Sequence, residues 1–396
     1  MVRFQMRQGI FGKFHKIILF CLAAGVLCIG FGDSSLIRIW KSGTWADNFA
    51  AGGPIGILVA HADENEDYYR DGPFELPVEG ASGYASVTLA LTDESGVFTI
   101  RQLEPGCGFI ILKEEDGRLQ VQVGEDAGYV PEEYVLINLP DILPSIVYND
   151  TNSDASLFMS SGYELPGVTG QQLYNACFQN DRLNMEQYAM PVLYPMALKL
   201  ANVQRTCRKN GQTLILYESY RPRDVQMEVS GALSDLSSGN SDVQRGLNQN
   251  GFNQGWFIAQ RLSNHQLGVA VDVSMGQVEQ YDLRACGPYL YNTAVQYFER
   301  EMPCLMHELS VAAAAFASPV SSSDDVSWRY AASAPTMTEA ALELQRYCTD
   351  CGLSPLSSEW WHFNDLETKA MIAGNAGDGG FRLPGCYSRE PGLPQP

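Results

Sequence analysis

One stretch constrains this chain more than any other, Ser263-Asn-His265-Gln-Leu-Gly268-Val-Ala270-Val-Asp272. Valine alternates with small or acidic residues from Gly268 onward, which is the period-two pattern of a strand with two different faces. Gly268, Ala270 and Asp272 then share one face, where the two small residues leave room beside the carboxylate. His265 precedes the glycine, so a turn there can bring its imidazole back to Asp272.

A second stretch, Glu359-Trp-Trp-His362, follows about ninety residues later. In an ideal strand Glu359 and His362 would face opposite sides, so we expect a bulge or a helical turn at the two tryptophans. A catalytic zinc ion takes three protein ligands and keeps one position for water. His265, Asp272 and His362 are the natural three ligands, and Glu359 is the natural base. The paired tryptophans would wall such a site.

A candidate catalytic cation follows the apolar run 213–217, which predicts a buried strand. The next residues include Tyr220-Arg221-Pro222, and an arginine fixed by a proline at the end of a buried strand is well placed for catalysis. His307 has no comparable context, and we interpret it as structural.

Short strands alternate with turn signals between residues 82 and 139, which predicts a small β-barrel. The expected strands cover residues 87–91, 97–100, 109–112 and 119–123. Residues 140–396 form the expected second domain, with an α+β fold. Its expected helices cover residues 171–178, 190–209 and 338–351. The Ser/Asn/Gly/Gln-rich segment 230–255 predicts a long loop at the rim of the site.

The start of the chain predicts export. Basic residues precede an apolar run at 17–32, so residues 1–35 are expected to be a signal peptide or a membrane anchor, with residues 36–81 as a spacer. The positive residues before the run keep that end inside and place the body outside. A net charge of −20 argues against nucleic-acid binding. Eight cysteines follow the apolar run, an even number that suits disulfides in an exported protein.

From about residue 137 to residue 366 the chain resembles the zinc D-Ala-D-Ala peptidases, which include the vancomycin-resistance D-Ala-D-Ala dipeptidases and related DD-carboxypeptidases. The resemblance rests on Ser263-x-His265-x-x-Gly268-x-Ala270-x-Asp272, Glu359-x-Trp361-His362 and Tyr220-Arg221-Pro222. It departs from the family at Glu218, where an aspartate is common, and in the long polar insert before Ser263. Residues 82–139 resemble bacterial Src-homology-3-type barrels of wall enzymes, with Arg118 where an aromatic residue often follows the Asp-Gly turn.

The resemblance implies an α+β fold with an antiparallel sheet that carries the site. It implies one Zn²⁺ ion held by His265, Asp272 and His362, with Glu359 assisting attack by zinc-bound water. Arg221 would stabilise the oxyanion. The implied substrate-binding residues are Ser263, Tyr220 and Trp361.

The function expected from this resemblance is a zinc-dependent DD-carboxypeptidase that hydrolyses the terminal D-Ala-D-Ala bond of peptidoglycan stem peptides. Two alternatives stay open: a dipeptidase acting on free D-Ala-D-Ala, and a non-catalytic wall-binding protein. Two interpretations of the barrel stay open, a wall-binding module and a plain spacer. Export together with wall binding favours the polymeric substrate. The expected location is the outer face of the cell membrane, reached through the N-terminal apolar segment, or the medium beyond it.

Overall fold

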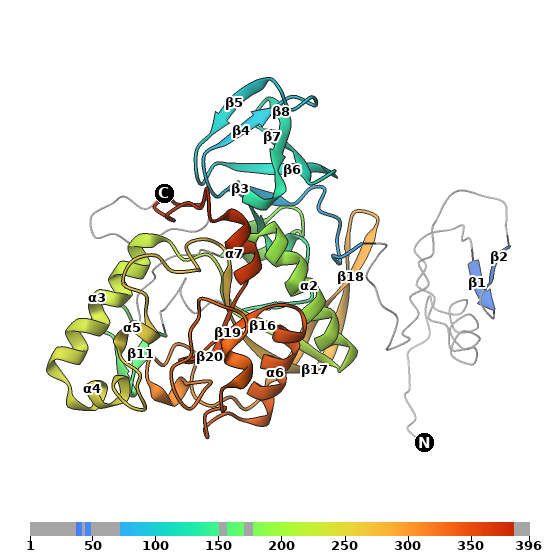
Figure 1. Cartoon of the computed structure of the whole chain (residues 1–396). Helices are drawn as coiled ribbons and strands as arrows, with labels where there is room; N and C mark the ends of the chain where they lie inside the picture. The colour runs from blue at the N-terminus through green and yellow to red at the C-terminus, as the bar shows by residue number, and fades with distance from the viewer. Residues whose placement is uncertain (1–36, 42–43, 49–71, 150–156, 170–176, 384–396) are drawn as a thin grey trace, which may run out of the picture. The chain divides into compact units, whose positions relative to one another are not determined.

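The computed structural model describes residues 37–41, 44–48, 72–149, 157–169 and 177–383 (Figure 1). The chain divides into two compact units, residues 1–66 and residues 67–396. In the first unit, β1 (Ile37–Lys41) and β2 (Thr44–Asn48) form an antiparallel pair within the expected spacer. The expected targeting segment, residues 1–35, lies outside the described residues. No helix in the described part of the chain is long and apolar enough to cross a membrane.

The second unit begins with an eight-stranded antiparallel sheet in the order β15-β9-β3-β6-β7-β8-β4-β5. Its strands are β3 (Ser82–Ala85), β4 (Leu89–Thr92), β5 (Thr99–Leu103), β6 (Gly108–Glu115), β7 (Arg118–Val123), β8 (Asp126–Pro131), β9 (Val135–Asn138) and β15 (Pro191–Leu193). The strands expected from the sequence in this region are therefore present. In β7 the residues Leu119, Val121 and Val123 are buried and their neighbours are not, as the period-two pattern predicts.

The strand β15 belongs to this sheet although it lies far along the sequence from the other strands. The first sheet therefore includes residues from beyond position 139, where the expected barrel ends. It pairs with β9 in the register Val192↔Ile137. The helix expected over residues 190–209 therefore starts later, as α2 (Tyr194–Lys209). The first part of that range forms ladder hydrogen bonds with β9 instead, so tertiary pairing outweighs the helical pattern.

The second sheet holds the two motif strands at its centre, in the order β10-β16-β17-β20-β19, with β18 paired to the far half of β17. These strands are β10 (Val147–Tyr148), β16 (Gln212–Glu218), β17 (Ala270–Cys286), β18 (Tyr289–Glu299), β19 (Ser354–Leu356) and β20 (Glu359–Asn364). Only the β10–β16 pair is parallel among the pairs described here. The fold is thus mixed α+β with antiparallel sheets, as expected.

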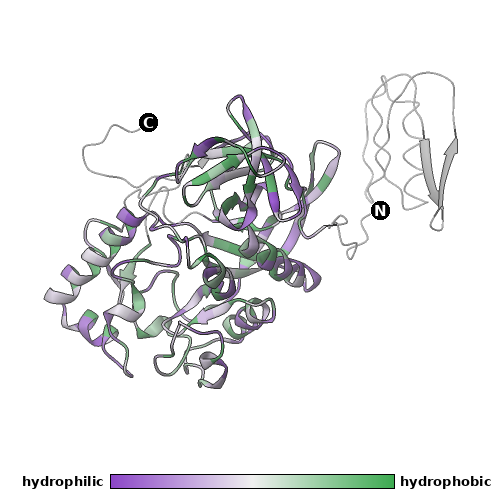
Figure 2. Ribbon diagram, turned by 45° about the horizontal axis from the view of Figure 1, so that its top comes forward, coloured by the Kyte–Doolittle hydropathy of each residue, from purple (hydrophilic) through white to green (hydrophobic). Residues whose placement is uncertain are grey.

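Helix α2 packs between the sheets, because it contacts β9 and β15 of the first sheet and β16 of the second. It also contacts α6 (Glu339–Asp350), which matches the helix expected over residues 338–351. A single hydrophobic cluster includes Val121 of the first sheet, Leu200 of α2, and Leu216 and Trp360 of the second sheet. Figure 2 shows apolar residues concentrated on the strands. The two sheets therefore share one core.

The segment 230–255 is largely helical, so the expectation of a long loop is wrong. Most of it lies within α3 (Arg223–Gly239), α4 (Ser241–Leu247) and α5 (Gln254–Phe257), which gather at the left of Figure 1, and residues 248–253 connect the last two. Val225, Val229 and Leu233 recur at helical spacing and are buried in a second hydrophobic cluster. The many serines and glycines lie on the remaining surface, which is why composition alone suggested a loop.

The remaining described elements are short. Of the helix expected over residues 171–178, residues 171–176 lie outside the described part, and the last two residues begin the strand β13. The other elements are β11 (Met159–Ser160), β12 (Tyr163–Glu164), β13 (Cys177–Asn180), β14 (Met185–Tyr188), α7 (Leu366–Ile372) and the 3₁₀ turns η1 (Glu132–Tyr134), η2 (Leu139–Asp141), η3 (Val311–Ala313) and η4 (Ser327–Tyr330). The six cysteines whose side chains are described, Cys107, Cys207, Cys286, Cys304, Cys348 and Cys351, are free thiols.

Candidate metal centre

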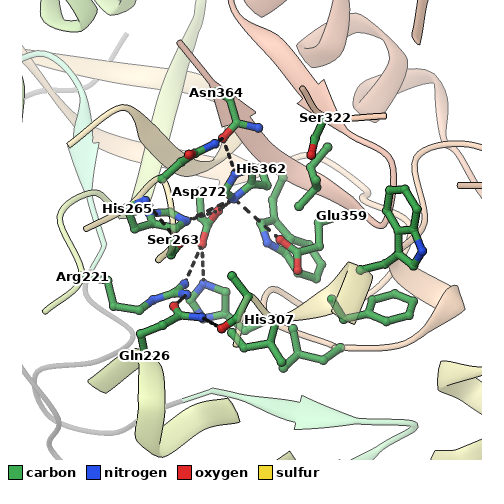
Figure 3. Close-up of a pocket in the computed structure, with 18 of the residues that line it drawn as sticks. Arg221, Gln226, Ser263, His265, Asp272, His307, Ser322, Glu359, His362 and Asn364 are labelled. Carbon is green, nitrogen blue, oxygen red and sulfur yellow. Dashed lines mark hydrogen bonds and ion pairs between the residues drawn. The ribbon is translucent and has the colours of Figure 1, made fainter. Parts of the chain in front are cut away.

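The three expected ligands meet at neighbouring strands of the second sheet (Figure 3). Asp272 on β17 is the register partner of His362 on β20, and their side chains meet, with Oδ1 of Asp272 at 2.9 Å from Nδ1 of His362. Nε2 of His265, from the loop before β17, lies 3.3 Å from the same carboxylate oxygen. All three side chains are buried, and one donor atom from each lies within 4.8 Å of the others.

An irregularity in β20 brings Glu359 to the same side as His362, as the sequence predicted. Pro355 of β19 pairs with Phe363, but the next residue, Leu356, pairs with Glu359. Residues 360–362 therefore have no register partner in β19, which is a bulge that changes the alternation of faces along β20. Oε2 of Glu359 consequently lies 3.7 Å from Nδ1 of His362.

Each histidine has one ring nitrogen fixed by an acceptor outside the centre. Nδ1 of His265 lies 2.7 Å from the carbonyl oxygen of Ser219, which can only accept, so this nitrogen carries the proton. Nε2 of His362 lies 2.9 Å from Oδ1 of Asn364, an oxygen that also accepts from Nδ2 of Asn264 at 2.7 Å. Such outer partners set the tautomer of metal-binding histidines.

The other two ring nitrogens therefore present lone pairs toward Asp272 when both imidazoles are neutral. Nε2 of His265 and Nδ1 of His362 lie only 3.1 Å apart, and both face Oδ1 of Asp272. Three acceptor atoms converge with no proton between them, an arrangement that a cation stabilises. Burial alone lowers the pKa of His362, but the hydrogen bond and charge of Asp272 raise it overall. The donor set of two imidazole nitrogens and one carboxylate oxygen fits a divalent metal ion.

Gly268 shapes the loop that carries His265. Its φ is +69°, in the left-handed region that favours glycine. A Cβ at this position would stand 2.3 Å from Cδ2 of Leu136 on β9. Its carbonyl accepts from the backbone N–H of Leu193 on β15 at 2.9 Å. The loop therefore lies directly against the first sheet.

Glu359 is buried and lies beside the ligand set. Burial raises the pKa of its carboxyl group to about 8, and the negative charge of Asp272 contributes further, while His362 and Arg221 act in the opposite direction. A cation held by the three ligands would lower this pKa. A carboxyl group that titrates near neutral pH is suited to accept and return a proton.

Arg221 is held by a network of buried partners. It faces Oδ2 of Asp272, whereas the two ligand histidines face Oδ1. Its Nε donates to Oε1 of Glu218 at 2.7 Å, its Nη2 contacts the second oxygen of Glu218, and its Nη1 donates to Oε1 of Gln226 at 2.6 Å. Nη2 also lies 3.5 Å from Oδ2 of Asp272, and the guanidinium lies over the ring of Phe158. Glu218, which departs from the family pattern, therefore serves as the partner of Arg221.

His307 is a site residue that the sequence analysis missed. Its Nε2 lies 3.1 Å from Oδ2 of Asp272 and 3.4 Å from Oε2 of Glu218. Its ring stacks on Phe158 with centroids 4.4 Å apart, and its backbone has φ +61°. No local motif marks this residue. The only sequence signal was the scarcity of histidine, which totals five in the chain.

Glu218, Asp272 and His307 also lie close enough to form a second ligand set. However, Nη2 of Arg221 already contacts both carboxylates. The guanidinium supplies the positive charge that a second metal would bring. We therefore assign one metal position, at His265, Asp272 and His362.

The centre opens into a pocket of about 210 Å³. Ser263 and Trp361, both expected to bind substrate, line it together with Arg221, Glu359 and the ligands. Tyr220 does not line the pocket. It is fully buried, its ring stacks on Phe381 and its hydroxyl donates to the carbonyl of Phe381 at 2.8 Å. The geometry gives Tyr220 a packing role in place of the expected contact with substrate.

Comparison with known proteins adds no family assignment. No protein-family model and no curated protein matches this sequence. A function can therefore be proposed only from the site and from the sequence motifs that form it.

Proposed function

We propose that the protein is a zinc-dependent DD-carboxypeptidase that removes the terminal D-alanine from peptidoglycan stem peptides. The observation that carries this proposal is the convergence of three potential metal-donor atoms from His265, Asp272 and His362 beside the buried Glu359. That arrangement matches a catalytic zinc site, with three ligands and a base next to the remaining open position. The family resemblance of the motifs supplies the substrate class.

His265, Asp272 and His362 would hold the zinc ion, which would lower the pKa of a bound water toward about 7 and polarise the substrate carbonyl. Glu359 accepts the proton of the attacking water and returns it to the departing amine of D-alanine. Arg221 lines the same pocket and would stabilise the oxyanion that grows on the substrate carbonyl; one such donor typically contributes roughly 3 kcal/mol. Trp361, buried beside Trp360, limits access of water.

The accompanying parts of the chain fit this proposal. We propose that residues 1–35 export the protein and either anchor it or are removed, and that the first sheet can bind the cell wall. The close alternative is a dipeptidase that cleaves free D-Ala-D-Ala with the same residues. A non-catalytic wall-binding protein is disfavoured because ligands, base and cation are all present and close together.

Incubating purified protein with zinc and either D-Ala-D-Ala or a stem pentapeptide, and measuring released D-alanine, separates these functions. Release from the pentapeptide supports the carboxypeptidase. Release from the dipeptide alone identifies the dipeptidase, and no release from either rejects the enzymatic proposal.

The Glu359→Gln variant tests the assigned base. We expect it to bind zinc as the parent does while its D-alanine release falls at least 100-fold, because an amide cannot accept the proton. His265→Ala should lose both zinc and activity. Metal content by atomic emission and D-alanine release are the two measurements. Full activity in Glu359→Gln would overturn the assignment.

A further inference from the structure

The pocket contains one basic side chain with no assigned role. Among its described lining residues, the only lysine and arginine are Lys369 and Arg221. All three guanidinium nitrogens of Arg221 already have partners, and the nearby carboxylates of Glu218 and Asp272 balance its charge. Since Arg221 is held by these partners and is assigned to the oxyanion, the terminal carboxylate of a substrate needs a different positive charge.

Lys369 is such a charge. It lies on α7, is partly buried, and makes no side-chain hydrogen bond or ion pair with any described residue. The acidic groups nearby in sequence are occupied, because Nζ of Lys199 lies 2.7 Å from Oδ1 of Asp365 and 2.9 Å from Oε2 of Glu367. Burial lowers the pKa of the Lys369 ammonium. A partly desolvated cation without a counter-ion is stabilised by an anionic ligand.

The position of Lys369 is fixed relative to the metal ligands. Helix α7 begins directly after β20, the strand that carries Glu359 and His362. Asp365 caps the helix, with Oδ1 accepting from the backbone N–H of Thr368 at 3.0 Å and Oδ2 from its hydroxyl at 2.6 Å. The backbone N–H of Lys369 also bonds to the carbonyl of Asp365 at 3.0 Å. A side chain on a capped helix is better positioned than one on a free loop.

We propose that Lys369 binds the free C-terminal carboxylate of the peptide substrate. This inference rests on the proposed function, whose substrate ends in such a carboxylate one residue beyond the cleaved bond. Ser263 lines the same pocket and offers only a neutral hydroxyl, so Lys369 provides the charge that distinguishes a chain end from an internal peptide bond. The site would then select for cleavage of one residue from a free C-terminus.

Calorimetry with N-acetyl-D-Ala-D-Ala and with its C-terminal amide tests the inference in the zinc-loaded Glu359→Gln background, where no hydrolysis interferes. We expect Lys369→Met to weaken binding of the acid about tenfold or more and to leave binding of the amide within twofold. Lys369→Arg should keep most of the preference for the acid. Lys209→Met, the same change at an exposed lysine at the end of α2, should change neither.

Three results would overturn the role of Lys369. Lys369→Met could leave the affinity for the acid unchanged, or it could weaken the binding of acid and amide equally. The third is that the Glu359→Gln protein with Lys369 intact does not bind the acid. Failure of the proposed reaction is separate from these results. If acid-selective binding depends on Lys369 but the wild-type protein with zinc releases no D-alanine, the reaction is rejected and the carboxylate site stands. If D-alanine is released and Lys369→Met leaves KM unchanged, the reaction stands and the carboxylate site is rejected.

Discussion

His307 restrains the oxygen of Asp272 that neither ligand histidine contacts. Its Nε2 donates to Oδ2 of Asp272 at 3.1 Å, and the stacked ring of Phe158 fixes the imidazole plane. Asp272 can therefore present Oδ1 alone to His265, His362 and an ion. Outer partners of this kind typically change metal affinity by about 10–100-fold.

Replacing His307 tests that role. His307→Phe keeps an aromatic ring over Phe158 but removes the donor, so we expect zinc affinity to fall about tenfold or more. His307→Gln retains a donor and should recover part of the loss. Competition with a chromophoric chelator measures both affinities. Equal zinc affinity in wild type and His307→Phe would show that the contact with Asp272 does not orient the ligand.

Residues inside short motifs could be predicted from the sequence, and residues brought in by the fold could not. His265, Asp272, Glu359 and His362 stand in patterned stretches, and the structure brings them together. His307 reaches Asp272 from a segment with no pattern of its own. Tyr220 belonged to a motif but points into the core, because the motif does not report which way a side chain faces after the strand ends.

At the scale of elements, the loop from His265 to Gly268 depends on one left-handed residue packed against another sheet. Gly268→Ala combines a strained φ with a Cβ placed 2.3 Å from Leu136, so we expect a loss of about 2 kcal/mol or more in the free energy of unfolding. Gly287→Ala is the matched control, since Gly287 also has positive φ but no atom within 4 Å of its Cβ position.

Urea denaturation of both alanine variants gives the comparison. In Gly287→Ala the free energy of unfolding should fall only by the cost of a positive φ at an alanine, about 1 kcal/mol. If the two variants lose the same stability, close packing of Gly268 against Leu136 contributes nothing.

Elements with a clear hydrophobic periodicity could be predicted from the sequence. Elements that form because of a tertiary partner could not. The strand β7, the strand β16 and the helix α6 follow their sequence patterns closely. The bulge of β20 was predictable because Glu359 and His362 could not otherwise share a face. By contrast, β15 forms a strand because β9 offers a free edge, and that information lies more than fifty residues away in the chain.

At the scale of the whole molecule, the two sheets share one hydrophobic core and should unfold together. Val121 of β7 and Leu216 of β16 belong to the same buried cluster. We expect amides of β7 and β16 to exchange with the same global free energy of opening, as in a single cooperative unit. Native-state hydrogen exchange at increasing urea concentration measures both. Separate opening energies for the two strands would show two independent units.

The bond from Leu193 to Gly268 and the packing of Leu136 under that glycine have a consequence for how such a protein can evolve. The first sheet packs directly against the loop that carries His265, through Leu136 and Leu193. Gene rearrangements that exchange the segment before residue 139 would remove β9, which supports β15 and, through Leu136, the loop that carries His265. The first sheet and the segment that carries the metal ligands must therefore be inherited together. Substitutions at Leu136 and Gly268 should likewise be selected together.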